Sequence, residues 1–305
     1  MEIVDFHSHF FSRPFFEALA SLAPGPESAE ERLTALSQRT GIELPPPDVE
    51  RHLARWLGEL DSRGVDHLVS FASVPPEAPA LARARELAGG RLSVMALLDP
   101  TAEGAAERAR ALLGEQGFSG LLVFPATHHF HLGEERVRAV LEVLAEHRAI
   151  LYVHCGLLVV KLRDLLGLPR THDLTFANPL AVIPAADRHR DVRFVIPHFG
   201  AGLLRETLMA GSQCANVYVD TSSSNSWVAT QPARTSLTQV FERALGVFGA
   251  GRILFGTDSG PFPAGWRADR LAEQSAVLDE LGISDADRAR ILGGNARELL
   301  SGVRA

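Results

Sequence analysis

From residue 50 onward, the chain alternates short apolar runs with amphipathic stretches. This alternation is typical of repeated βα units around a parallel sheet. Most of the runs are continuously apolar, as expected for strands that are covered on both faces. Together with a run near the start, the pattern predicts eight strands, at residues 3–7, 67–72, 92–98, 119–124, 149–154, 192–198, 216–220 and 252–258.

Eight amphipathic stretches between and after these runs predict helices, at about residues 50–63, 77–88, 102–115, 134–147, 178–189, 202–211, 235–248 and 267–281. Eight strands that alternate with eight helices predict an α/β fold of the (β/α)8 barrel type. Two further short helices are expected near residues 284–291 and 295–301, with Asn295 capping the last one. No linker divides the chain, so we expect residues 1–305 to form a single domain.

Three connections are longer than a turn requires: residues 10–49, 155–177 and 221–234. Each follows a predicted strand, so all three are expected on the C-terminal face of the barrel. Barrel enzymes build their active sites on that face, and long loops in compact domains commonly act as lids or binding loops.

Metal-capable side chains stand where four of the predicted strands end. The first strand ends in VDFHSHF, with His7 and His9 on the same side because side chains alternate along a strand. Such a pair alone also fits a chance arrangement or a buried structural histidine. His154, His198 and Asp258 end the fifth, sixth and eighth strands. Their convergence at one barrel mouth therefore favours a metal site.

Three histidines and one carboxylate suit zinc or another late first-row divalent ion, with positions left open for water. An open position indicates catalysis, because a bound ion lowers the pKa of water towards neutrality. Asp258 is the natural general base. His198 is expected either to stabilise charge on a substrate oxygen or to deliver a proton to it.

The motifs DFHSH, YVHCG, VIPHFGAG, FGTDSGPFP and GGNARELL together resemble the amidohydrolase superfamily. The closest resemblance is to its branch of metal-dependent hydrolases and aromatic-acid decarboxylases, typified by aminocarboxymuconate semialdehyde decarboxylase, and it spans residues 3–300. The resemblance implies that His7, His9, His154 and Asp258 bind one metal ion. It also implies that His198 is a catalytic histidine beside that ion.

The fourth strand departs from the pattern of the binuclear members. These carry a carboxylated lysine there, whereas this chain has GLLVFP at residues 120–125. One divalent ion per chain, zinc, is therefore the expected cofactor. Some relatives in this branch are lactonases that work without metal, so the ligand set by itself leaves the metal requirement open.

Other residues near the predicted mouth have substrate or supporting roles. Asp220, which ends the seventh strand, is expected to orient the pocket, and Asp5 is expected to be structural. Arg267, which follows Asp258 closely in the sequence, either binds a substrate carboxylate through two hydrogen bonds or caps the eighth helix. The residues expected to contact substrate are His129, Trp227 and Arg267.

Composition narrows the class of partner. The net charge of −7 comes from 30 basic and 37 acidic residues in a mixed order, without the basic stripe that nucleic-acid binding requires. Two cysteines are too few for a disulfide framework. No apolar run reaches the ~18 residues of a membrane span, and the start lacks the pattern of a signal peptide. We expect a cytoplasmic protein that acts on a small molecule, as a monomer or a homodimer.

Two reactions and one binding role remain as hypotheses. The leading hypothesis is metal-dependent hydrolysis of a small carbonyl, amide or lactone substrate. The second is non-oxidative decarboxylation of an aromatic or unsaturated acid, which the resemblance of FGTDSGPFP to decarboxylases supports. The third is a barrel that binds ligands without turnover, and the complete set of catalytic residues argues against it.

Overall fold

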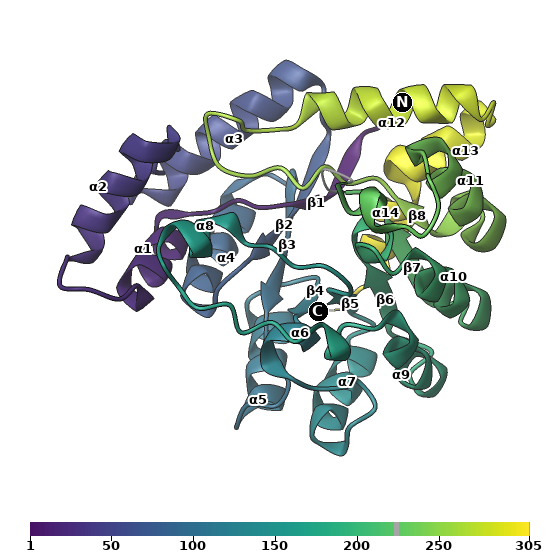
Figure 1. The fold of residues 1–305 in the computed structure, drawn as a ribbon, viewed down its shortest axis with the longest axis horizontal. Helices are drawn as coiled ribbons and strands as arrows, with labels where there is room; N and C mark the ends of the chain where they lie inside the picture. Colours follow the sequence, from purple (N-terminus) through teal and green to yellow (C-terminus); the bar gives the residue numbers. More distant parts are fainter. Residues whose placement is uncertain (223–225, 305) are drawn as a thin grey trace.

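Eight parallel strands follow one another in chain order around the barrel that the sequence predicts (Figure 1). The computed structural model describes residues 1–222 and 226–304. Strands β5, β6 and β8 end earlier than predicted, so His154, His198 and Asp258 lie in the loops that begin there. The strands are β1 (Val4–Ser8), β2 (His67–Ala72), β3 (Leu92–Leu97), β4 (Gly120–Val123), β5 (Ile150–Val153), β6 (Arg193–Ile196), β7 (Val217–Asp220) and β8 (Ile253–Leu254).

Helices surround the strands, and each predicted helix has a counterpart in the structure. Two helices, α1 and α2, lie in the first connection, where the sequence predicts only a loop. The α-helices are α1 (Arg13–Leu22), α2 (Ala29–Thr40), α3 (Val49–Arg63), α4 (Ala78–Leu87), α5 (Ala105–Arg110), α6 (Pro125–His128), α7 (Glu135–Glu146), α8 (Lys161–Leu165), α9 (Ile183–Arg188), α10 (Leu204–Gln213), α11 (Leu237–Phe248), α12 (Ala268–Glu280), α13 (Asp285–Ala289) and α14 (Asn295–Ser301). Short 3-10 or π turns are η1 (Pro75–Glu77), η2 (Ala111–Glu115), η3 (Leu174–Phe176), η4 (Pro179–Val182), η5 (His198–Gly200), η6 (Ser226–Thr230), η7 (Ala250–Arg252) and η8 (Arg290–Gly294).

Apolar side chains from the strands fill the barrel interior, and α14 covers the end of the barrel at which the strands begin. Ala296 and Leu299 of α14 belong to the same buried cluster as the inward-facing strand residues. Asn295 donates hydrogen bonds from Nδ2 to the carbonyls of Ala250 (2.6 Å) and Ile253 (2.8 Å). The prediction that Asn295 caps α14 is therefore wrong: this side chain ties the helix to the start of β8.

Backbone hydrogen bonds join the last strand to the first and close the barrel. Phe6 N–H donates to the Phe255 carbonyl at 2.8 Å, and Asp258 N–H donates to the His7 carbonyl at 2.9 Å. An extra residue between Asp5 and Ser8, opposite Leu68–Ser70 of β2, makes a bulge in β1. Closure at this seam places the loop after β8 directly beside His7.

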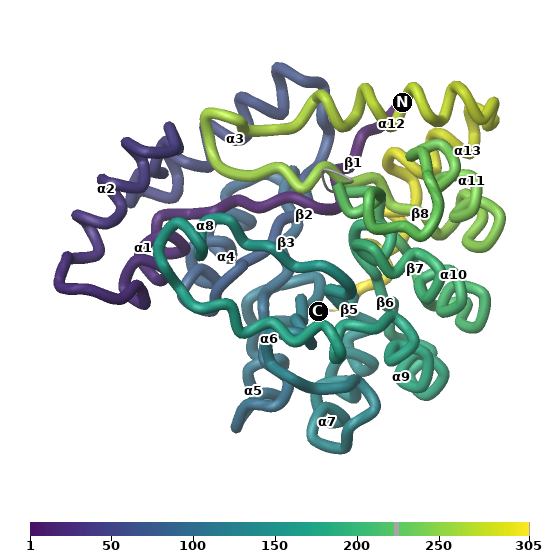
Figure 2. Tube along the Cα trace, viewed as in Figure 1, coloured from purple at the N-terminus to yellow at the C-terminus, as the bar shows by residue number. Residues whose placement is uncertain are grey.

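The first and fifth connections pack together at the C-terminal end of the barrel. Helices α1, α2 and α8 lie side by side at the left of Figure 2. Their apolar side chains form one small core, which we call the α1–α2–α8 cluster. Its buried members are Phe15, Phe16, Leu19, Ala20, Ala23, Leu33, Leu36 and Leu168. The third long connection, residues 221–234, lies partly outside the described residues.

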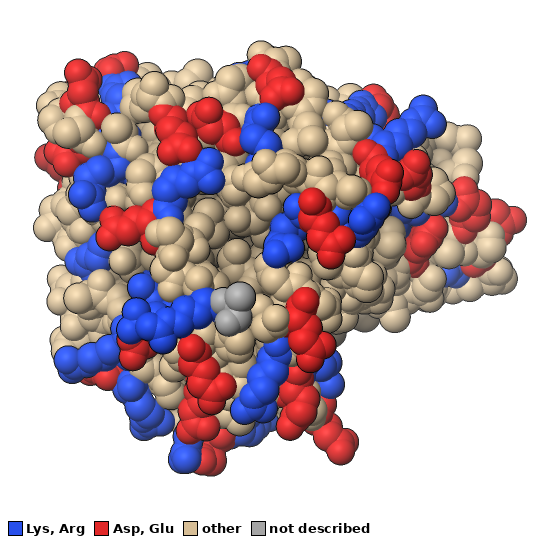
Figure 3. Space-filling model, turned by 180° about the vertical axis from the view of Figure 1, so that it is seen from behind, with Lys and Arg blue, Asp and Glu red and all other residues tan. Residues whose placement is uncertain are grey.

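Charged side chains of both signs alternate over the face shown in Figure 3. This distribution agrees with the mixed order of charges along the sequence. Within the described residues, no helix combines the length and the apolar character that a membrane crossing requires.

The close packing of β4 against β5 predicts a strong effect of a single methyl group. A Cβ atom at Gly120 would lie 2.2 Å from the Ile150 carbonyl oxygen, so Gly120→Ala should lower the free energy of unfolding by about 3 kcal/mol. The matched control is Gly58→Ala on the exposed side of α3, where nothing lies within 4 Å of the new atom. This control should stabilise the protein by up to about 1 kcal/mol. Urea unfolding of both variants checks the packing, and equal effects would contradict it.

Candidate metal centre

The structure brings the five predicted strand-end residues into one connected cluster. The ring centroid of His198 lies 4.7 Å from that of His7 and 5.3 Å from that of His154. His9 Nε2 lies 3.3 Å from Asp258 Oδ1. The His7, His154 and His198 side chains are buried, with exposed fractions of 3%, 7% and 7%. All five therefore line the same end of the barrel.

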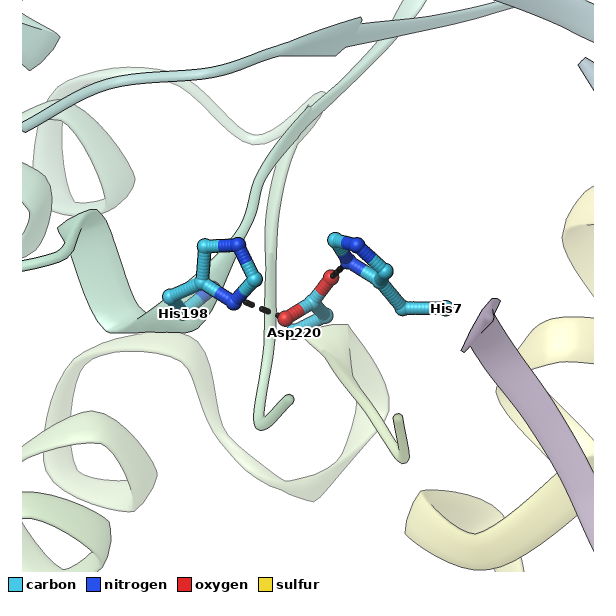
Figure 4. A group of neighbouring side chains, drawn as sticks. All are labelled: His7, His198 and Asp220. Atoms are coloured by element: carbon cyan, nitrogen blue, oxygen red, sulfur yellow. Dashed lines mark hydrogen bonds and ion pairs between the residues drawn. The ribbon is translucent and has the colours of Figure 1, made fainter. Parts of the chain in front are cut away.

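Two groups of three side chains in the described residues have the spacing of metal ligands, and His7 belongs to both. The first is His7, His9 and Asp258, in which the His7 Nε2–Asp258 Oδ1 distance is 3.6 Å. Ligand atoms bound tetrahedrally at about 2.1 Å lie about 3.4 Å apart, which matches this group. The second is His7, His198 and Asp220 (Figure 4).

Asp220 lies between His7 and His198 with both carboxylate oxygens occupied by donors (Figure 4). Oδ1 accepts hydrogen bonds from His198 N–H (2.8 Å), Ser222 N–H (3.0 Å) and the Ser222 hydroxyl (2.5 Å). Oδ2 accepts from His7 Nδ1 (2.8 Å) and from the Tyr152 hydroxyl. With five donors, this carboxylate has no oxygen left for an ion, so Asp220 supports the site from behind.

These hydrogen bonds determine which ring nitrogen carries the proton. His7 Nδ1–H donates to the carboxylate, which leaves the Nε2 lone pair free for the mouth. The Ser222 hydroxyl donates to Asp220 and therefore accepts at 2.9 Å from His198 Nδ1–H. His198 also presents an unprotonated Nε2. Both rings are in the tautomer that a metal ion or a substrate proton requires.

Burial favours the neutral form of the His7 and His154 imidazoles. It lowers the pKa of His7, although Asp220 opposes this effect, and it lowers the pKa of His154 well below the ordinary value. The His154 Nδ1 is buried without a hydrogen-bond partner among the described residues. Burial also opposes ionisation of Asp258 and Asp220. Hydrogen bonds, from His9 to Asp258 and from His7 and Ser222 to Asp220, and the positive charge that the histidines carry when protonated outweigh it and lower both carboxyl pKa values below the usual range. Neutral imidazoles and an ionised carboxylate are the forms that bind metal.

Strained backbone conformations coincide with the site. Five consecutive residues, 198–202, have φ between 44° and 104°, and Asp258 has φ of 58°. Gly200 has no alternative in this turn, because a Cβ atom would lie 1.9 Å from Thr207 Oγ1. Non-glycine residues in this region cost of order 1–3 kcal/mol each and are typical of functional sites.

Asp5 is structural, as the sequence suggests, and it joins the two strands that carry the first group of ligands. Its buried carboxylate accepts from His7 N–H (3.0 Å), Thr257 N–H (3.1 Å), the Thr257 hydroxyl (2.5 Å) and Trp266 Nε1 (2.8 Å). Burial raises the pKa of Asp5 to about 7 despite these donors. The network fixes the β8 loop against β1 and so positions Asp258.

Two of the three residues expected to contact substrate already have hydrogen-bond partners within the protein, whereas the buried Trp227 Nε1 has none among the described residues. His129 Nε2 donates to the Thr171 carbonyl at 2.8 Å. The Arg267 guanidinium forms two hydrogen bonds, of 2.8 and 2.6 Å, with Asp269. Trp227 is buried, and its ring lies 6.4 Å from that of Phe199. Their roles towards a substrate therefore remain predictions.

Sequence reasoning missed two residues of the site, Tyr152 and Ser222. Tyr152 lies two residues before His154 on β5, so the alternation of side chains along the strand was a usable signal. Ser222 stands two residues after Asp220 in a serine-rich stretch, where no local pattern distinguishes it from its neighbours.

Comparison with known proteins identifies related families and folds. A family model described as amidohydrolase matches residues 4–302. None of the curated proteins compared with this chain matches it.

Several solved structures share the fold over nearly the whole chain. The 5-carboxyvanillate decarboxylase from Sphingomonas paucimobilis is 14% identical with a TM-score of 0.65, covering 98% of this chain and 99% of its own. A decarboxylase of the same name from Novosphingobium aromaticivorans, solved with manganese and 4-hydroxy-3-methoxy-5-nitrobenzoic acid, is 15% identical with a TM-score of 0.66 and coverages of 98% and 96%. A putative 2-pyrone-4,6-dicarboxylic acid hydrolase from Pseudomonas putida is 20% identical with a TM-score of 0.63 and coverages of 99% and 98%.

The Asp220 network predicts a tautomer change in one variant. In Asp220→Asn, the amide oxygen can replace Oδ1, and the amide nitrogen then faces His7 Nδ1 as a donor. His7 should shift its proton to Nε2, as a histidine does when a neighbouring aspartate becomes asparagine in serine proteases. Zinc affinity should then fall about 10- to 100-fold. Imidazole ¹⁵N shifts and zinc competition titration measure both effects.

Asp269→Asn, in the exposed pair with Arg267, is the control and should leave both readouts unchanged. An Asp220→Asn protein in which His7 keeps its proton on Nδ1 would contradict the assignment.

Proposed function

The chain belongs to the amidohydrolase family, and we propose that it is a hydrolase that uses one zinc ion and water to cleave a small carbonyl, amide or lactone substrate. The observation that carries the proposal is the spacing of His7, His9 and Asp258, with the His7 proton held on Nδ1 by Asp220 and the Asp258 carboxyl pKa lowered. His154 completes the proposed ligand set, because its ring lies 5.3 Å from that of His198 in the same cluster and its buried Nδ1 lacks a hydrogen-bond partner among the described residues.

The donor set suits the proposed ion. Neutral imidazole nitrogens and a carboxylate oxygen are ligands that zinc prefers, and Asp220 behind His7 supplies the outer carboxylate typical of such sites. When bound, the ion would lower the pKa of a water molecule and polarise a substrate carbonyl.

The remaining steps belong to side chains of this protein. The Asp258 carboxylate is ionised and about one third exposed (35%), so it can accept a proton from the attacking water. His198 Nε2 carries a lone pair towards the mouth, and it can take up this proton and pass it to the leaving group. The buried contacts of His198 Nδ1 keep the ring in the orientation for that transfer.

A second candidate function is non-oxidative decarboxylation, which the fold shared with the 5-carboxyvanillate decarboxylases supports. The pairing of Arg267 favours hydrolysis of an uncharged substrate. The hydrogen bond that Arg267 donates to Asp269 raises the pKa of Arg267, and the charges of Asp269 and Asp258 add to this effect. A substrate carboxylate would have to displace Asp269 to bind the Nε and Nη2 edge of this guanidinium.

A substrate panel with metal removal tests the proposal. Zinc-loaded protein should release acid from at least one lactone, amide or ester, without carbon dioxide. Activity should disappear with a chelator and return with zinc. Carbon dioxide from a hydroxybenzoate without any hydrolysis would establish the second candidate. If neither acid nor carbon dioxide is released from any substrate, both reactions are contradicted and only the role of a binding protein remains.

Three variants test the division of labour within the site. His7→Ala should lose the single zinc ion that each wild-type chain binds. His198→Ala should keep the ion while turnover falls by about two orders of magnitude or more, the usual effect of removing an acid/base group. Asp258→Asn should bind zinc more weakly and be inactive even at saturating zinc. Elemental analysis paired with the rate of each variant measures both properties.

A His198→Ala protein without zinc, together with a fully active Asp258→Asn protein, would contradict these roles. Two tightly bound ions per wild-type chain would contradict the single-ion assignment.

A further inference from the structure

Glu77 is a buried carboxylate that the proposed reaction leaves without a role. It lies at the end of η1, directly before α4, and its exposed fraction is 0%. Oε1 accepts from Ser12 N–H (2.6 Å) and the Ser12 hydroxyl (3.0 Å), and Oε2 accepts from Ser73 N–H (2.8 Å). Burying a charge is costly unless it is well hydrogen-bonded, so this arrangement calls for a specific explanation.

Ser73, which Glu77 holds, is the hydrogen-bond partner of His9. The Ser73 Oγ lies 2.9 Å from His9 Nδ1 and 3.4 Å from the Phe71 carbonyl. When the hydroxyl proton points to that carbonyl, the oxygen accepts from His9 Nδ1–H. In the competing tautomer His9 donates from Nε2–H to the Asp258 carboxylate, 3.3 Å away, so the Ser73 hydroxyl and Asp258 compete for the ring proton.

Ser12, the other residue that Glu77 holds, is connected to His9 through its neighbour in the chain. It directly follows Phe11, whose ring stacks on that of His9 with centroids 4.7 Å apart and planes 6° from parallel. Phe11 has φ of 44°, a strained conformation for a non-glycine residue, and it packs against the α1–α2–α8 cluster. Glu77 therefore connects both segments that confine the His9 ring.

We propose that Glu77 is a positioning residue that acts through Ser73 to hold His9 with its proton on Nδ1 and its Nε2 ready for the metal ion. The proposal rests on the metal site proposed above. The same carboxylate anchors Phe11 through Ser12, so it also fixes the ring that covers His9. In this respect Glu77 and Ser73 serve His9 as Asp220 serves His7, with a hydroxyl group interposed.

Two variants test the connection in separate ways. Ser73→Ala removes the acceptor, and the His9 proton should then move to Nε2, where Asp258 can accept it. Glu77→Gln keeps the size but presents an amide nitrogen to Ser12 N–H or Ser73 N–H, so it should shift the same tautomer equilibrium. Imidazole ¹⁵N shifts of the metal-free proteins at about pH 8 report the tautomer directly.

Zinc competition titration provides the second readout. Each single variant should lower zinc affinity about 10- to 100-fold. The double variant should be no weaker than the weaker single variant, because the two residues act in series. The matched control is Glu86→Gln, in an exposed pair with Arg83 on α4, which should change neither readout.

The outcomes separate positioning from simple support of the fold. A Glu77→Gln protein that melts earlier but keeps the wild-type His9 tautomer and zinc affinity would overturn the proposal. If Glu77→Gln does not fold, Ser73→Ala decides alone, and an unchanged tautomer in it would overturn the proposal equally. A wild-type protein that binds no zinc would refute the proposed function, and the metal-free spectra would still decide whether Ser73 and Glu77 set the His9 tautomer.

Discussion

The hydrogen bond from His7 to the buried Asp220 carboxylate is the interaction on which the rest of the barrel mouth depends. An uncompensated carboxylate at this depth would cost several kcal/mol, and five donors from β1, β5 and the loops after β6 and β7 offset that cost. Asp220 comes from β7, His7 from β1 and Tyr152 from β5, so the site forms only when the barrel is assembled. In return, the carboxylate holds the His7 proton on Nδ1 and directs Nε2 to the mouth.

The same arrangement recurs with weaker acceptors around the cluster. His198 donates from Nδ1 to the Ser222 hydroxyl, and His9 lies within hydrogen-bond distance of the Ser73 hydroxyl. In each case a partner within the protein contacts Nδ1 and so fixes the orientation of the ring. His154 differs, because its Nδ1 is buried without a partner among the described residues. The mouth thus contains several imidazoles that are oriented before any ligand arrives, although the strained turn at residues 198–202 opposes folding there.

The parts of the fold and site that local pattern determines were predictable from the sequence. The apolar runs located all eight strands, and the polar residues that end them located the histidines and Asp258. Helices α1 and α2 were missed because PGP and PPP interrupt the pattern between residues 10 and 49. Ser222 and Ser73 were missed because their roles depend on contacts with histidines far away in the chain. Whether Arg267 faces substrate could not be predicted either, since its sequence neighbourhood does not reveal the bidentate pair with Asp269.

The central claim is that Asp220 supports the metal site without binding the ion. Anomalous diffraction from crystals of the zinc-loaded protein tests it most directly. The account predicts one anomalous peak within about 2.1 Å of Nε2 of His7 and His9, of a ring nitrogen of His154 and of an Asp258 oxygen, with Asp220 still hydrogen-bonded to His7 Nδ1. A peak bonded to Asp220 and His198, with Asp258 free, would contradict it.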